Sequence, residues 1–114
     1  MPRFVVLEHD HPHLHWDLML ERGGALWTWR LPRLPEAGTP LDADRLADHR
    51  LAYLDYEGPV SGGRGRVVRR ERGELTWLAC EEGRVEARLE GARLRGVVRL
   101  TRGAGGAWRL DWAA

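Results

Sequence analysis

One alternating stretch carries most of the information about the fold: Leu14-His15-Trp16-Asp17-Leu18-Met19-Leu20-Glu21. Successive side chains of a β-strand point to opposite faces. The even-numbered residues, all apolar, therefore share a face that we predict to be core. The odd-numbered residues share the other face, where His15 and Asp17 stand side by side next to the apolar Met19. The stretch predicts a half-buried strand that presents an imidazole and a carboxylate away from the leucine face.

The rest of the chain consists of short apolar segments punctuated by glycine, which is typical of antiparallel strands. We predict a mainly β fold, a small closed or partly open antiparallel β-barrel with a short helical turn. The helical turn is placed over Leu41 to Asp48, starting near Asp42 as an N-cap, after a proline-rich connection over residues 31–40. Turns are expected at Gly23-Gly24, 58–63, Gly73, Gly83, Gly91 and 103–106. The candidate strands are residues 3–8, 14–21, 24–30, 50–57, 65–71, 74–79, 84–90, 93–101 and 107–112.

The composition indicates a single domain over residues 1–114. With 114 residues, 43% of them hydrophobic and six of them Trp, the chain has enough apolar surface for one core and no room for a second. The Trp positions alternate along the predicted strands, which favours core packing over stacking on a base. Cys80 is the only cysteine, so no internal disulfide can form and a reducing compartment is favoured. No apolar run is long enough for a signal peptide or a bilayer span, so we expect a soluble, cytoplasmic protein without a membrane partner.

A metal site is predicted near the start of the chain. Four of the five histidines lie at alternate positions just before and within the stretch quoted above: His9, His11, His13 and His15. If strand 3–8 pairs with strand 14–21 as a hairpin, His9 reaches the place where His15 and Asp17 stand. Two imidazoles and one carboxylate form a facial ligand set that leaves positions open for water or substrate. We interpret His11 and His13 as polar loop residues.

The same residues resemble a known family. The segment Phe4-Val5-Val6-Leu7-Glu8-His9-Asp10, followed by the stretch 14–21, resembles the opening motif of the 3′-phosphoesterase domain of bacterial DNA ligase D, an enzyme of DNA end repair. Further similarities follow in the same order: Trp29 to Pro35, Asp48-His49 with Tyr53 and Tyr56-Glu57-Gly58, and Gly83 to Arg99. The similarity runs from Phe4 to Trp112 with a shortened middle, and it suggests a stand-alone, shortened form of the domain.

The resemblance implies a compact β-barrel that binds Mn²⁺ and trims 3′ ends of DNA or RNA to leave a 3′-hydroxyl; Zn²⁺ and Co²⁺ are alternative metals. Carried over by position, the metal ligands are His9, His15 and Asp17, the phosphate-binding group is His49, and Tyr53 is its neighbour on one face of the predicted strand 50–57. Arg33 stands where the family has Lys and supplies charge. Where the family has Arg two residues after the metal-binding Asp, this chain has Met19, for which Arg45 and Arg64 are candidate substitutes. DNA ligase and polymerase repair proteins are implied as partners of a monomer.

Other interpretations stay open at this point. A non-catalytic nucleic-acid end-binding module would keep the metal site and lose turnover through Met19. His15-x-Asp17 with a distant His is also the ligand pattern of non-haem iron oxygenases. The arginine-rich segment 62–72 either follows a nucleic-acid backbone or forms a solvated strand rim. DNA and RNA, and phosphatase and phosphodiesterase activity, are not separated by the sequence.

Overall fold

The computed structural model describes all 114 residues and shows a mainly β protein, as predicted. Its helical segments are two single 3-10 turns. Neither has the length and apolar character needed to cross a bilayer. The turns are η1 (Leu51–Leu54) and η2 (Ala104–Gly106). The strands are β1 (Arg3–His9), β2 (His15–Arg22), β3 (Ala25–Leu31), β4 (Leu41–His49), β5 (Gly58–Pro59), β6 (Arg66–Glu81), β7 (Arg84–Gly91), β8 (Arg95–Arg102) and β9 (Trp108–Ala113).

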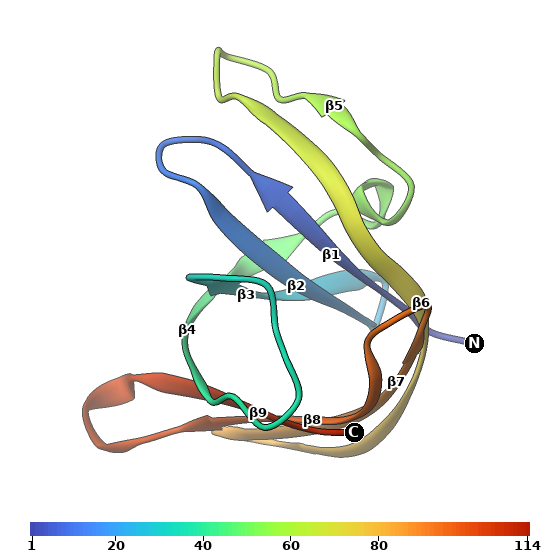
Figure 1. Cartoon of the computed structure of the whole chain (residues 1–114), viewed down its shortest axis with the longest axis vertical. Helices are drawn as coiled ribbons and strands as arrows, with labels where there is room; N and C mark the ends of the chain where they lie inside the picture. Colours follow the sequence, from blue (N-terminus) through green and yellow to red (C-terminus); the bar gives the residue numbers. More distant parts are fainter.

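Eight of the strands form a closed antiparallel barrel (Figure 1). The order is β1-β2-β3-β4-β9-β8-β7-β6, and pairing of β1 with β6 closes the ring. The two-residue strand β5 adds to the edge of β6 through Gly58 and Pro59. The seam between β4 and β9 is the shortest in the ring, with Leu41, Asp42 and Ala43 opposite residues of β9. The predicted closed barrel is therefore confirmed, because every long strand finds a partner on both sides.

Two predictions about the middle of the chain are wrong. Residues 41–48 are strand β4 and not a helical turn, because Leu41 and Ala43 alternate into the core while the backbone pairs with β3 and β9. Tertiary pairing here outweighs the N-cap signal of Asp42. Residues 50–57 are not a strand, because the chain leaves the sheet after His49 and forms η1. Leu54 of η1 is buried against the outer side chains of β1 and β2.

The expected turn at Gly73 is also wrong, since β6 runs unbroken through it. Gly73 lies where β6 pairs on both sides, with Phe4 of β1 on one side and with Gly91 of β7 on the other. A Cβ at Gly73 would come within 2.1 Å of the Glu90 carbonyl oxygen. Glycine therefore permits a close backbone approach between β6 and β7, which is another common use of glycine inside a strand.

Two separate apolar clusters lie on the two faces of β1 and β2. The inner cluster fills the barrel and draws on every one of its eight strands, with Trp29 completely buried and the other five Trp packed against it. The predicted role of the tryptophans in the core is thus confirmed, although Leu14 precedes β2 and is 55% exposed, so it does not belong to the leucine face. The outer cluster consists of Val5, Leu7, Met19, Leu26, Leu54 and Val67.

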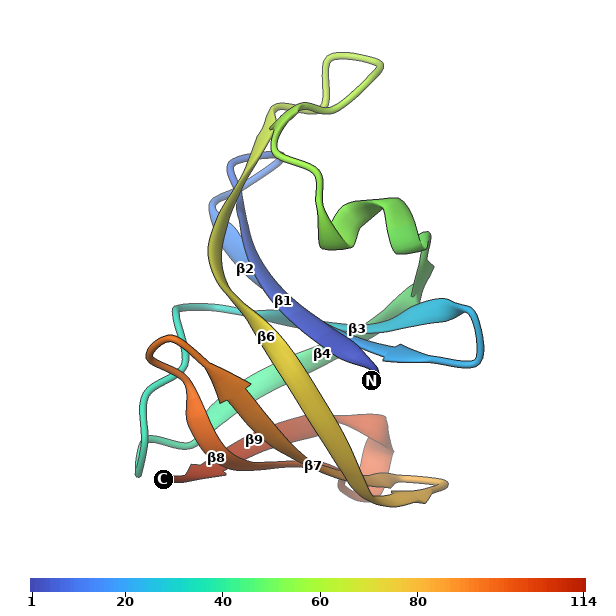
Figure 2. The same ribbon diagram turned by 90° about the vertical axis from the view of Figure 1, so that its right-hand side faces the viewer.

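The outer cluster lies beneath the segment that follows β4. Leu54, Tyr53 and Val60 of this segment pack on the outward side chains of β1 and β2. Figure 2 shows η1 beside β1 and β2, on the outside of the barrel. Residues 50–65, which we call the covering segment, therefore cover this part of the barrel wall. The odd-numbered side chains of β2 point toward this segment.

Candidate metal centre and cleft

The three predicted ligands meet at one end of the β1–β2 hairpin. The expected hairpin is present, with His9 directly opposite His15 and Leu7 opposite Asp17. His15 and Asp17 are buried and His9 is half-buried. One ligand atom from each of the three residues lies within 4.8 Å of those from the other two. The structure thus brings together a set of side chains close enough to share one cation.

The hydrogen bonds of His15 leave two lone pairs facing each other. Nδ1 of His15 lies 2.8 Å from the carbonyl oxygen of His13, which only accepts, so Nδ1 carries the proton and donates. In the neutral ring Nε2 then carries a lone pair, and it lies 3.4 Å from Oδ2 of Asp17. Nε2 of His15 and Oδ1 of Asp17 are buried without a hydrogen-bond partner. Two acceptors in this arrangement require a proton or a metal ion between them.

His9 shows the same arrangement on the other side. Its Nε2 lies 2.7 Å from the carbonyl oxygen of Arg64 and donates to it, which leaves Nδ1 free as a ligand. Metal-bound imidazoles commonly donate their second N–H to a backbone carbonyl, which fixes tautomer and ring orientation. Both histidines meet this condition, His15 through the His13 carbonyl and His9 through the Arg64 carbonyl. His9, His15 and Asp17 therefore fit a divalent cation: they offer nitrogen and carboxylate donors, their histidine tautomers leave one ring nitrogen free, and two of the buried donor atoms have no hydrogen-bond partner.

The charge on Asp17 is sensitive to what fills the site. Burial raises the pKa of the Asp17 carboxyl above its ordinary value of 3.8, and the neighbouring His15 and Arg30 act in the opposite direction. A bound divalent cation would add a much larger favourable charge at the same place and hold the carboxylate ionised.

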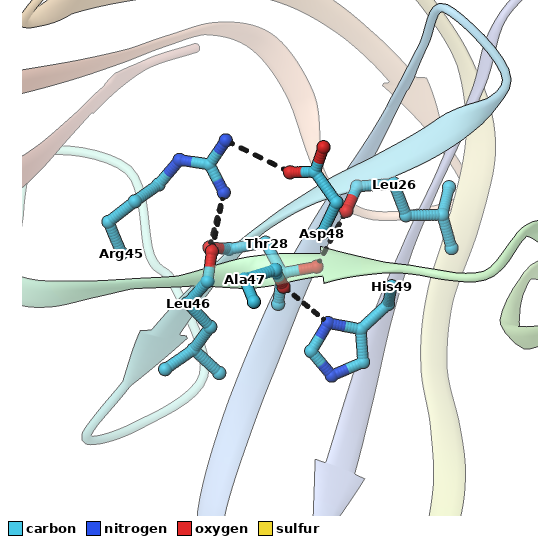
Figure 3. Close-up of polar contacts among 7 residues, drawn as sticks. All are labelled: Leu26, Thr28, Arg45, Leu46, Ala47, Asp48 and His49. Carbon is cyan, nitrogen blue, oxygen red and sulfur yellow. Dashed lines mark hydrogen bonds and ion pairs between the residues drawn. The ribbon is translucent and has the colours of Figure 1, made fainter.

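A cleft of about 240 Å³ opens over the ligand set. His49 and Tyr53 stand in its wall, their ring centroids 5.7 Å apart. Nδ1 of His49 donates to the Ala47 carbonyl oxygen at 2.9 Å, and Figure 3 shows the ring on the side of β4 opposite to Arg45 and Asp48. The predicted proximity of His49 and Tyr53 is found, but not through alternation along a strand. His49 ends β4 and Tyr53 lies on η1.

The candidate arginines are placed differently from one another. Arg33 is exposed in the β3–β4 connection and does not line the cleft. Arg45 is occupied by the carbonyl oxygens of Thr28 and Leu46 and by Asp48, as Figure 3 shows in part, and it stacks on Trp27 and Trp29. Arg64 lines the cleft from the rim. Met19 forms an apolar part of the wall, only 2% exposed.

Two further residues line the cleft that were not predicted to belong to the site. His11, expected to be a plain loop residue, lines the cleft with its ring centroid 6.4 Å from that of His9, whereas His13 is exposed. Arg30 of β3 stands directly opposite Asp17. Counting outward from the Gly23-Gly24 turn would have placed Arg30 there, because a two-residue hairpin loop fixes the register of both strands.

The arginine-rich segment 62–72 is partly neutralised. Arg70 pairs with Glu8 at 3.0 Å, and Arg69 lies 3.9 Å from Glu57. Arg66 and Arg72 are exposed and make no ion pair. The solvated-rim interpretation therefore describes part of the segment, and the remaining arginines keep their charge available.

Comparison with known proteins identifies the chain as a small β-barrel of the DNA Ligase D 3′-phosphoesterase domain family. The family profile matches residues 7–102, and the chain belongs to this family. Among its relatives is the multifunctional non-homologous end joining protein LigD of Pseudomonas aeruginosa, which is 34% identical over 110 residues, covering 88% of this chain and 13% of the relative. The protein of the same name from Mycobacterium bovis is 31% identical over 114 residues, covering 92% of this chain and 15% of the relative. The chain thus spans about one seventh of the length of these relatives.

Proposed function

We propose that this chain is a metal-dependent 3′-phosphoesterase that processes DNA or RNA ends in repair. Family membership supports a role in end processing, since the family is described by its 3′-phosphoesterase activity and the relatives are named for end joining. The observation that carries the metal dependence is the pair of facing acceptors, Nε2 of His15 and the carboxylate of Asp17, with His9 alongside. Such a pair is costly to bury unless a cation lies between.

Mn²⁺ is the metal we propose, with Zn²⁺ and Co²⁺ as alternatives. Two imidazole nitrogens and one carboxylate suit all three ions. The three candidate ligands come from one hairpin at the edge of the cleft and would together hold the ion where a substrate in the cleft can reach it. When bound, the cation would withdraw electron density from a phosphoryl oxygen and so favour attack at phosphorus.

His49 and Tyr53 are proposed to act on the substrate from the opposite wall. His49 holds its Nδ1–H against a backbone carbonyl, so Nε2 is the nitrogen that can take or give a proton at the phosphoryl group. The Tyr53 hydroxyl is a further donor beside it. The cleft has a volume of only about 240 Å³, which favours a small terminal group of the substrate over an internal stretch of a strand.

A primer-template with a 3′-phosphate or a 3′-terminal ribonucleotide tests the proposal. Purified protein with Mn²⁺ is expected to shorten or dephosphorylate the primer, and metal-free protein and His15→Ala are expected to leave it intact. Glu74→Gln, which removes an exposed carboxylate of β6 away from the cleft, serves as the control and should retain activity. Absence of product from the wild-type protein with Mn²⁺, Zn²⁺ and Co²⁺ alike would remove the enzymatic claim.

A nucleic-acid end-binding module is the second candidate, and the apolar Met19 in the cleft wall is the observation that favours it. This function predicts metal-dependent retention of the 3′-phosphorylated primer without release of phosphate. Single-turnover measurement with protein in excess separates the two candidates, because a slow enzyme still forms one equivalent of product.

A further inference from the structure

Arg30 lines the cleft from the barrel wall, whereas the other arginine of the lining, Arg64, comes from the covering segment. Arg30 projects from β3 directly opposite Asp17, and it lines both the cleft above the ligand set and an adjoining hollow of about 340 Å³ that contains His13 and His15. The wall between these two hollows therefore carries a permanent positive charge. This charge adjoins the place where the proposed function requires a phosphoryl group.

The donors of Arg30 are not fully used within the protein. Its Nε is buried without a hydrogen-bond partner, and the nearest carboxylate oxygen, Oδ1 of Asp17, lies 4.0 Å away, beyond hydrogen-bond distance. The side chain is nevertheless 39% exposed, so part of it reaches solvent. Arg45 and Arg64, by contrast, donate to backbone carbonyls and to neighbouring side chains. Arg30 therefore places in the cleft wall a guanidinium group whose N–H donors are not all used by the protein.

We propose that Arg30 is the residue that binds the phosphoryl oxygens of the substrate in this cleft. One side of its guanidinium faces the orphaned Oδ1 of Asp17, and its remaining N–H groups are available to an anion beside the ligand set. The planar fork of Arg matches two phosphate oxygens, which a point charge would not. Met19, its neighbour on the cleft wall, offers no hydrogen bond. The inference rests on the proposed function for its substrate class and adds the group that recognises the phosphate.

Arg30→Gln tests this role with two separate probes, Mn²⁺ alone and inorganic phosphate added to the Mn²⁺-loaded protein, both by titration calorimetry. We expect Mn²⁺ affinity to be retained or to rise, because a cation next to Asp17 is removed. Phosphate affinity should fall about tenfold to hundredfold, the range expected for loss of charge-assisted hydrogen bonds. The phosphate affinity of Arg30→Lys should lie between those of Arg30→Gln and the wild type. Arg88→Gln, which removes an exposed arginine of β7 on a distant part of the barrel, should change neither affinity.

The outcomes separate this inference from the proposed function. Equal phosphate affinity of wild type and Arg30→Gln, or absence of phosphate binding by the wild type, overturns the inference. A parallel loss of Mn²⁺ and phosphate affinity also overturns it, since Arg30 would then only position Asp17. Arg30-dependent phosphate binding by a protein that hydrolyses no 3′ end sustains the inference and rejects the enzyme. If Arg30→Gln does not fold, Arg30→Met, which keeps the aliphatic part of the side chain, gives the same readout.

Discussion

Replacing Asp17 with Asn should stabilise the metal-free protein while it destroys the metal site. Nε2 of His15 lies 3.4 Å from Oδ2 of Asp17, and Oδ1 of Asp17 is buried without a hydrogen-bond partner. An Asn at this position can turn its N–H₂ toward Nε2 and carries no charge. A buried unsatisfied group costs about 1–3 kcal/mol. Allowing for the lost contact with Arg30, we expect a gain of about 1–2 kcal/mol in the free energy of unfolding, or roughly 4–8 °C in Tm.

The pH dependence follows from the direction of the pKa shift. Burial raises the pKa of Asp17, so the folded state holds a proton more tightly than the unfolded state, whose value is near 3.8. The ionised carboxylate therefore costs stability at pH values above its folded pKa, and the cost disappears as the pH falls toward 3.8. The advantage of Asp17→Asn should accordingly be largest near neutral pH and shrink on acidification.

Thermal unfolding followed by near-ultraviolet circular dichroism, in EDTA and in Mn²⁺, measures both effects. At a Mn²⁺ concentration about 100 times Kd, the wild-type protein should gain about 2.7 kcal/mol, and Asp17→Asn should gain little. Glu74→Gln provides the control for removal of a carboxylate away from the cleft. The reasoning is refuted if Asp17→Asn unfolds at a lower temperature than the wild type in EDTA, because Asp17 would then be a structural ion-pair partner. It is equally refuted if Mn²⁺ stabilises the variant as much as the wild type.

Three other variants test separate parts of the structure. His49→Ala should retain Mn²⁺ affinity and hydrolyse a 3′-phosphorylated primer about 10²- to 10⁴-fold more slowly, the usual contribution of a general acid or base; a fall in Mn²⁺ affinity to the level of Asp17→Ala would make His49 a ligand instead. Glu71→Gln should lose about 1–3 kcal/mol in urea unfolding, since the Glu71 carboxylate accepts from the backbone N–H groups of residues 72, 92, 93 and 94. Burial raises the pKa of the Glu71 carboxyl, but the four backbone donors outweigh burial and leave the pKa lowered. The stability that Glu71 contributes is therefore present above pH 4.5 and is lost as the pH falls through the pKa of the folded state. If Glu71→Gln and the wild type lost the same stability on acidification, this role of Glu71 would be contradicted. Leu7→Ala should cost about 2–5 kcal/mol by leaving a cavity in the outer cluster, and a loss below 1 kcal/mol in the same urea assay would mean that the cover over the cleft is not packed as described.

The parts of the structure that sequence predicted well are those set by local alternation and short turns. The two faces of β2 follow from a period of two residues, and the Gly23-Gly24 turn is compatible with a tight hairpin, so the inner and outer positions of residues 15–21 were available from the sequence. The meeting of His9 with His15 follows from the same hairpin logic. Arg30 was overlooked because the register was not extended from the metal ligands to the third strand.

The parts that were predicted wrongly depend on contacts distant in sequence. Strand β4 gains its conformation from partners as remote as β9, and a plausible N-cap at Asp42 could not reveal that pairing. The segment after His49 has an apolar pattern that fits a strand, but Leu54 is buried by the outer faces of β1 and β2. Gly73 signals a turn by residue type, whereas the close carbonyl of Glu90 decides its use. Each error concerns a residue whose conformation is determined by a neighbour more than ten positions away.

The core of the barrel and the candidate site are set by one register and cannot vary independently. Leu18 and Leu20 fill the barrel, and this fixes Asp17 and Met19 on the outer face because alternate side chains point in opposite directions. A slip of one residue in the pairing of β2 would bury the Asp17 carboxylate among leucines and move Leu18 out of the inner cluster. The burial of an unpaired charge makes this register strongly unfavourable in free energy. The same pairing places Arg30 opposite Asp17 through the β2–β3 register. Of the residues that line the cleft, Tyr53, Val60 and Arg64 come from the covering segment, so side-chain changes in that segment can alter how the substrate is held while the ligand set stays intact.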